Sequence, residues 1–152
     1  MESIILASTS ARRQELLSQI GVRFTVRSQD IDESIRSGEL ANDYVTRMAQ
    51  EKADSALCAL HASKDSSDTL VLAADTSVVC DADVLGKPMD EADAIAMLLK
   101  LSGREHRVLS AVTLATKDKQ RTVLSESRVR FREISAKEAQ QYYRSGEPQG
   151  KA

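Results

Sequence analysis

Aromatic residues are scarce in this chain of 152 residues: they make up 3% of it, and tryptophan is absent. Because hydrophobic residues still reach 41%, the core must be built from leucine, valine, isoleucine and alanine. Long apolar runs are also lacking, and none approaches the roughly 20 residues that a transmembrane helix requires. The N-terminal run Ile4-Ile5-Leu6-Ala7 is too short for the apolar region of a signal peptide. We therefore expect a cytoplasmic protein without a membrane partner.

Charge of one sign does not dominate the chain either. The formal net charge is −2 with 29% charged residues, whereas nucleic-acid-binding domains usually carry a strong basic surface. The densest basic cluster is Arg128, Arg130 and Arg132, which alternate with Val129 and Phe131. This alternation predicts a strand with one solvated arginine face, and the stacking aromatics of an RNA-binding surface are missing. We expect no nucleic-acid partner.

Cysteine is nearly absent, with two residues, Cys58 and Cys80, in the whole chain. They form no Cys-x-x-Cys motif and no metal-binding set with histidines. We expect two buried free thiols in a reducing compartment, and a disulfide is the less favoured interpretation.

Apolar periodicity alternates between helical and strand patterns along the chain. Helices are predicted over residues 11–20, 41–62, 91–101 and 136–144. Strands are predicted over residues 4–7, 22–26, 70–74, 78–79, 84–85, 107–116 and 122–131. The strand over residues 70–74 is expected to be buried on both faces and to be interrupted at Asp75-Thr76. This order indicates a single α/β domain with a mixed, twisted sheet flanked by helices.

Arg12 and Arg13 conflict with the helix that the pattern predicts for them. They fall in its first turn, where the helix dipole disfavours cations by up to about 1 kcal/mol each. With Ser8 and Ser10 just before them, two alternatives carry equal weight. One is a polyphosphate site at the helix N-terminus. The other is a capped surface helix with two solvated arginines.

Lys52 is the second conflict, because it lies at helical spacing from Met48 and Tyr44 within an apolar stripe. A lysine in such a place either extends its ammonium group to the edge of the stripe or pairs with a buried anion. The first explanation is the commoner one.

Asp75 is the third conflict, since it directly follows the apolar strand of residues 70–74. A buried carboxylate without partners costs several kcal/mol, so Asp75 must meet donors, a cation or a metal. Ends of buried strands also carry catalytic groups in α/β folds. A structural turn aspartate is the alternative. We favour the functional interpretation, because Asp30, Asp32 and Glu33 could supply a metal partner.

Seven short segments, spread in order along the entire chain, resemble the motifs of the Maf family of nucleotide pyrophosphatases. They are Leu6-Ala7-Ser8-Thr9-Ser10-Ala11-Arg12-Arg13, Asp32-Glu33, Glu51-Lys52-Ala53, Ala74-Asp75-Thr76, Gly86-Lys87-Pro88, Leu101-Ser102-Gly103 and Glu147-Pro148-Gln149-Gly150-Lys151-Ala152. No single segment is decisive, but seven in the family's order are very specific. The resemblance implies a Maf/ITPase-like fold with an active-site cleft.

The resemblance also implies a chemistry and a role for each matching residue. The reaction is hydrolysis of a nucleoside triphosphate between its α- and β-phosphates, with Mg²⁺ or Mn²⁺ as cofactor. Asp75 is the implied general base, and Glu33 and Asp75 are the implied metal ligands. The implied substrate-binding residues are Ser8, Arg13, Lys52 and Lys87 for the phosphates, and Arg12 and Thr76 for base selection.

Within the family, Ala74-Asp75-Thr76 resembles the pyrimidine branch, which acts on dTTP, UTP and modified pyrimidine nucleotides, rather than the 7-methyl-GTP branch. The resemblance leaves room for a homodimer. A different class of function is a non-catalytic regulator of septum formation that binds nucleotide or a division partner. A purine triphosphatase related by fold is a third, weaker alternative. The charge of Asp75 favours catalysis, because pure binding has little need for a carboxylate among phosphate-binding cations.

The family's chains continue beyond Lys151-Ala152 with a Gly-Ala-Tyr and an Ile-Gln-Gly segment, whose glutamine helps to define the base pocket. The resemblance therefore implies one Maf-like domain over residues 1–152 that lacks the family's C-terminal segment.

Overall fold

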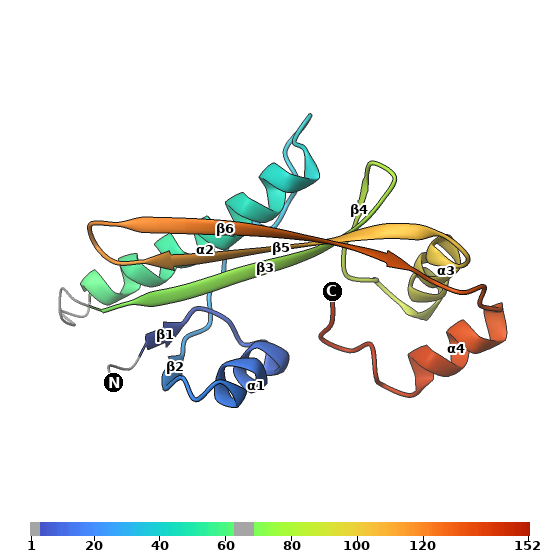
Figure 1. The fold of residues 1–152 in the computed structure, drawn as a ribbon, viewed down its shortest axis with the longest axis horizontal. Coiled ribbons are helices and arrows are strands. Elements are labelled where there is room, and N and C mark those ends of the chain that lie inside the picture. The colour runs from blue at the N-terminus through green and yellow to red at the C-terminus, as the bar shows by residue number, and fades with distance from the viewer. Residues whose placement is uncertain (1–3, 63–68) are drawn as a thin grey trace. The chain divides into compact units, whose positions relative to one another are not determined.

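A computed structural model describes residues 4–62 and 69–152 (Figure 1). Its elements are β1 (Ile4–Leu6), α1 (Ala11–Gln19), β2 (Phe24–Val26), α2 (Ala41–Ala62), β3 (Val71–Cys80), β4 (Asp83–Leu85), α3 (Glu91–Leu101), β5 (Glu105–Ala115), β6 (Gln120–Arg130) and α4 (Ala136–Arg144). The strands follow the order β2-β1-β3-β5-β6, and β4 pairs with β3. Strand β1 is parallel to β2 and β3, whereas β4 is antiparallel to β3, so the predicted mixed α/β sheet is confirmed.

The chain divides into two compact units. One consists of Met1–Asp75 with Ser110–Ser125, and the other of Thr76–Leu109 with Glu126–Ala152. This division is finer than the single domain expected from the sequence. The single domain over residues 1–152 stays a prediction.

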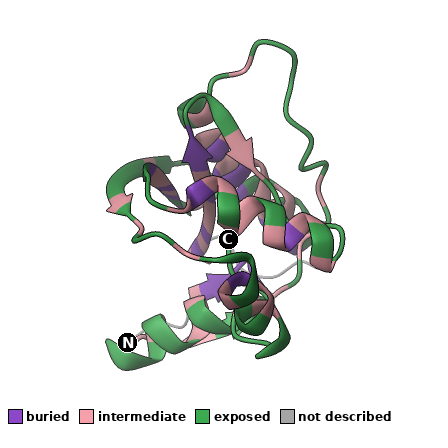
Figure 2. Cartoon of the chain, turned by 90° about the vertical axis from the view of Figure 1, so that its right-hand side faces the viewer, coloured by how far each residue is buried: buried purple, intermediate pink, exposed green. Residues whose placement is uncertain are grey.

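The core of the first unit lies between α2 and the strands beside it. Helix α2 buries one stripe, whose members pack against residues of β1, β3 and β5. Figure 2 shows the buried residues of the chain in purple. The buried cluster consists of Ile5, Ala7, Ala53, Ala56, Leu60, Val71, Ala73 and Ala115. Among the described residues no phenylalanine or tyrosine is buried, which confirms the predicted aliphatic core.

Strand β3 is longer than the sequence predicted. It runs from Val71 to Cys80, so Asp75 lies within the strand and does not end it. The alternation of buried Val71, Ala73, Ser77 and Val79 continues past Asp75, because the β-branched residues beyond it keep the backbone extended. The sequence predicted burial on both faces of this strand, but most residues on one face are only half-buried.

Short capped helices and tight turns build the second unit. Strand β4 pairs antiparallel with the end of β3 through a turn at Asp81, whose φ is 56°. Helix α3 begins at the N-cap Asp90 and packs against α4. Helix α4 begins with a capping box in which the Ser135 hydroxyl and the Glu138 carboxylate each bond the other residue's amide.

The two cysteines differ in exposure. Both thiols are free, as predicted, and Cys80 is buried, but Cys58 is exposed, so the prediction for Cys58 is wrong. Its position explains this. Cys58 is two residues away from both Ala56 and Leu60, and on a helix with 3.6 residues per turn that spacing places it roughly on the opposite side from them. The arginine strand behaves as predicted, with Arg128 and Arg130 exposed and Val129 half-buried. In the part of the chain that the structure describes, no helix has the length and apolarity to cross a membrane.

Candidate active site

The first group of candidate residues surrounds the start of α1. Ser10 is the N-cap, and its hydroxyl accepts a hydrogen bond from the Arg13 amide at 3.5 Å. The hydroxyl of buried Ser8 accepts from the Ser10 amide at 3.2 Å and from Nη1 of Arg13 at 3.1 Å. The helix is therefore capped, as one alternative predicted, but Arg13 turns inward to Ser8 and is not simply solvated.

Arg12 and Arg13 serve different surroundings although they are neighbours. Arg12 is exposed and pairs with Glu15 at 2.9 Å. Burial lowers the pKa of Arg13, against the opposing effect of the negative charges of Asp75 and Glu33. Arg13 thus shares an electrostatic environment with these two carboxylates, whereas Arg12 is a surface group.

Lys52 brings the two candidate carboxylates together. Its Nζ lies 2.7 Å from Oδ1 of Asp75 and 2.9 Å from Oε1 of Glu33. The side chains of Lys52 and Asp75 are 12% and 15% exposed, so this ammonium does not extend to solvent. Lys52 therefore pairs with anions, as the alternative expected, although Asp75 is partly exposed and Glu33 is half exposed. We call Glu33, Lys52 and Asp75 the carboxylate–lysine cluster.

Three different elements supply the carboxylate–lysine cluster. Lys52 lies on α2 beside the fully buried Ala53, which sets the side chain at the edge of the core. Asp75 occupies β3 in register with buried Ala73 and Ser77, two residues away on either side, and therefore shares their face of the strand. Glu33 comes from the irregular segment between β2 and α2. With Arg13 nearby, two cations and two carboxylates cancel each other's formal charge.

Glu33 and Asp75 form a donor set that suits a hard divalent cation. Carboxylate oxygens are the ligands that Mg²⁺ and Mn²⁺ prefer, and Mg²⁺ commonly binds through one or two carboxylates plus substrate phosphates and water. Both carboxylates already meet at one cation, the ammonium of Lys52. Within residues 4–62 and 69–152, no group of three or more histidine, cysteine, aspartate or glutamate side chains is arranged to hold a metal ion. In sites with one or two carboxylates, water and phosphate oxygens supply the remaining ligands of the ion.

Two predicted substrate-binding residues belong to the second unit. Thr76 follows Asp75 on β3, and Lys87 lies exposed after β4. Their place in the site stays a prediction, as does the role of Arg12 in base selection.

Sequence reasoning missed two residues of α2 beside the cluster. Tyr44 was assigned to the apolar stripe, but its hydroxyl donates to the backbone carbonyl of Glu33 at 2.7 Å. Arg47 donates to the backbone carbonyl of Ser34 at 2.9 Å. The only signal for Arg47 was its spacing of four residues from Glu51, which is typical of ordinary helix surfaces.

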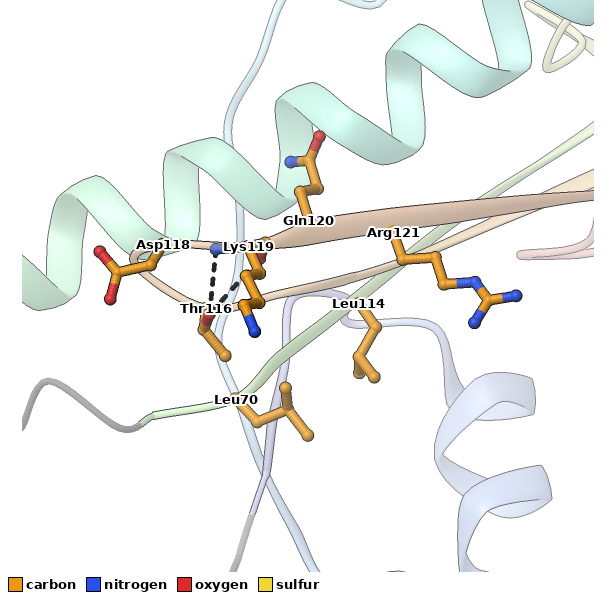
Figure 3. A pocket seen from close by; sticks show the side chains of 7 residues that line it. All are labelled: Leu70, Leu114, Thr116, Asp118, Lys119, Gln120 and Arg121. Atoms are coloured by element: carbon orange, nitrogen blue, oxygen red, sulfur yellow. Dashed lines mark hydrogen bonds between the residues drawn. The ribbon is translucent and has the colours of Figure 1, made fainter.

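A separate hollow lies near the turn between β5 and β6 in the first unit (Figure 3). Leu70 and residues of the hairpin from Leu114 to Arg121 line it, and the turn is closed by hydrogen bonds between Thr116 and Lys119. None of the candidate site residues lines this hollow. It is therefore distinct from the carboxylate–lysine cluster.

Comparison with known proteins decides the family. Residues 3–152 match the family Maf, described as Maf-like protein. The chain belongs to the Maf family. It is 48% identical over 149 residues to a dTTP/UTP pyrophosphatase of Hahella chejuensis, which covers 98% of this chain and 73% of that relative. It is also 48% identical over 159 residues to a dTTP/UTP pyrophosphatase of Cupriavidus metallidurans, covering 100% of this chain and 79% of that relative.

A solved structure supports the fold of this Maf chain. The Ham1 protein of Staphylococcus aureus superposes with a TM-score of 0.57 at 17% identity, covering 89% of this chain and 73% of that one. At this identity the likeness concerns the fold alone, and it confirms the predicted α/β class.

Proposed function

We propose that this Maf protein is a nucleoside-triphosphate pyrophosphatase that hydrolyses dTTP and UTP to the monophosphate and diphosphate. Relatives that carry this name are 48% identical over nearly the whole chain. The observation that carries the chemistry is the carboxylate–lysine cluster, in which the ammonium of Lys52 lies within hydrogen-bonding distance of both Asp75 and Glu33. Its closeness to Arg13 adds a second positive charge for a polyphosphate.

Asp75 is the proposed general base. Its carboxylate accepts a proton from water as the water oxygen attacks the α-phosphorus, and the bond to the bridging oxygen of the β-phosphate breaks. The electron pair of that bond leaves with diphosphate. Lys52 donates a hydrogen bond to Asp75 and thereby holds the carboxylate in one orientation.

A divalent cation, Mg²⁺ or Mn²⁺, is proposed as the cofactor, held by Glu33 and Asp75. Such an ion neutralises phosphate oxygens and orients the triphosphate. The Ser8 hydroxyl accepts a hydrogen bond from the Arg13 guanidinium, and the remaining N–H donors of Arg13 suit a phosphate oxygen. Lys52 and Lys87 are proposed to bind the rest of the chain of phosphates. Arg12 and Thr76 are proposed to discriminate the base.

We propose the cytoplasm as the compartment and a homodimer as the assembly. Neither proposal is needed for the chemistry at Asp75.

The test is pyrophosphate release from a nucleotide panel with Mg²⁺ or Mn²⁺. We expect kcat/KM for dTTP and UTP to exceed that for GTP and 7-methyl-GTP at least tenfold. Equal or higher kcat/KM for 7-methyl-GTP would reject the pyrimidine assignment. Nucleotide binding without any turnover, measured by calorimetry, would favour the regulator that binds nucleotide and does not cleave it.

A further inference from the structure

The segment that carries Glu33 is held by hydrogen bonds and ion pairs rather than by burial. Residues 27–40 connect β2 to α2 without a helix or strand, and the side chain of Glu33 is 51% exposed. Fixing such a backbone costs about 1–2 kcal/mol per residue. Specific bonds must offset this cost if Glu33 is to stay at Lys52.

Arg47 on α2 supplies three bonds to this segment, two to Glu39 and one to Ser34. Its Nε and Nη2 donate to the two carboxylate oxygens of Glu39 at 2.6 and 2.8 Å, and Nη1 donates to Glu51 at 3.3 Å. Nη2 also donates to the backbone carbonyl of Ser34 at 2.9 Å. One guanidinium therefore ties α2 to two points of the segment, on either side of its turn.

The low exposure of both side chains strengthens the pair of hydrogen bonds from Arg47 to Glu39, which we call the fork. The side chains of Arg47 and Glu39 are 14% and 10% exposed, and a two-pronged arginine–carboxylate pair with little solvent is the stronger kind of ion pair. The hydrogen bonds from Arg47 lower the pKa of Glu39 to about 2, so the pair stays charged across the physiological range.

Tyr44 holds the neighbouring peptide. Its hydroxyl donates to the carbonyl of Glu33 at 2.7 Å, and the guanidinium of Arg47 lies 5.6 Å from the centre of its ring. The carbonyls of Glu33 and Ser34 are thus each held by a side chain of α2. The same helix carries Lys52, about 7.5 Å further along its axis than Arg47, at 1.5 Å per residue.

We propose that Arg47 and Tyr44 are positioning residues that fix Glu33 opposite Asp75, and so set the affinity of this pair for a divalent cation. The proposal rests on the proposed function only in taking Glu33 as a metal ligand. Among the described residues, no hydrogen bond or ion pair joins either side chain to Lys52 or Asp75, so each acts through the backbone that bears Glu33.

The experiment measures Mn²⁺ binding by electron paramagnetic resonance on the chain without nucleotide. Tyr44→Phe removes one hydroxyl and keeps the ring, and Arg47→Met keeps the apolar stem and removes the fork. Loss of a group that orients a metal ligand typically weakens metal binding by about 10–100-fold. We expect about tenfold or more for Arg47→Met and a smaller loss for Tyr44→Phe. Arg144→Gln is the matched control, because the exposed ion pair of Arg144 with Glu91 lies outside residues 27–40 and α2, and it should leave the affinity unchanged.

A second readout separates positioning from general stability. In a Glu33→Gln background, Tyr44→Phe should cause no further loss of Mn²⁺ affinity, because the ligand that it positions is gone. An equal loss with and without Glu33, or unchanged affinity in both Tyr44→Phe and Arg47→Met, would overturn the proposal. If Arg47→Met does not fold, Tyr44→Phe decides alone. Mn²⁺ binding without pyrophosphate release would refute the proposed function and still test the positioning.

Discussion

Lys52 on α2 and Asp75 on β3 meet across the edge of the core, with Nζ 2.7 Å from Oδ1 and both side chains at most 15% exposed. Glu33 joins the same ammonium from the connecting segment. Two acidic groups and one cation therefore meet at a single point of the first unit. Substituting one of them at a time measures what each contributes to turnover and stability.

Asp75→Asn should abolish most turnover while sparing the fold. The amide oxygen can still accept from Lys52, but the variant lacks a base and one charge of the metal pair. We expect kcat to fall by roughly 10² or more, the usual range for losing a general base, with a small change in Tm. Pyrophosphate release at saturating Mn²⁺ and thermal unfolding provide the measurements. A variant that unfolds easily yet turns over normally while folded would make Asp75 a structural residue.

Lys52→Met should make stability depend on divalent cations. Two carboxylates would face each other without their shared ammonium, and because Glu33 is half exposed we expect a loss of about 1–3 kcal/mol. Mn²⁺ would replace the missing charge, so its addition should raise the Tm of the variant more than that of the parent protein. Thermal unfolding in chelator and in millimolar Mn²⁺ tests this, and an equal shift in both proteins would contradict it.

His106 should make the folded protein sensitive to acid. The side chain is 5% exposed, its Nδ1 has no hydrogen-bond partner among the described residues, and its ring meets Phe131 edge-on at 4.9 Å. Burial lowers its pKa below the ordinary value of 6.5. Below about pH 6.5 the unfolded chain therefore binds more protons than the folded one, so stability falls as the pH drops through this window.

Denaturant unfolding between pH 5 and 8 tests the role of His106. His106→Phe keeps an aromatic partner for Phe131 and should reduce the loss of unfolding free energy as the pH falls. His61→Gln, at the exposed end of α2, should not change this pH dependence. Identical slopes for His106→Phe and the parent would show that other groups control the acid response.

A side chain at Gly103 should destabilise the protein. Its φ is 65°, and an added Cβ would lie 3.1 Å from Cγ of Glu133. We expect Gly103→Ala to destabilise the protein by about 1–2 kcal/mol, from the left-handed backbone and the close contact together. Gly86→Ala is the control, since an added Cβ there meets nothing within 4 Å and should cost less than about 0.5 kcal/mol. Denaturant midpoints compare the two, and equal midpoints would be evidence against the strain.

Local pattern predicted the elements of this chain well and its long-range contacts only in part. The apolar stripe of α2 and the cap at Ser10 follow from residues close in sequence, so both could be predicted. Asp75 and Lys52 were recognisable as conflicts with burial. The partner of each could not be predicted, because residues 23 positions apart meet only after the sheet forms.

The length of β3 and the roles of Tyr44 and Arg47 show where sequence reasoning stops. A carboxylate in an apolar run was interpreted as the strand's end, yet a nearby ammonium lets the backbone continue through Asp75. Tyr44 and Arg47 have ordinary helical spacing, and their function depends on a segment whose path no periodicity describes.

The unequal exposure of the two thiols gives the protein a ready attachment point for a probe. Cys80 is buried, so a thiol-reactive spin label or fluorophore should modify Cys58 alone, without any substitution. Cys58 lies on the same rigid helix as Lys52, six residues and about 9 Å further along the axis. A paramagnetic Mn²⁺ ion at Glu33 and Asp75 would broaden or quench the signal of that label. The native chain can thus report occupancy of the carboxylate–lysine cluster in real time, as nucleotide arrives and diphosphate leaves.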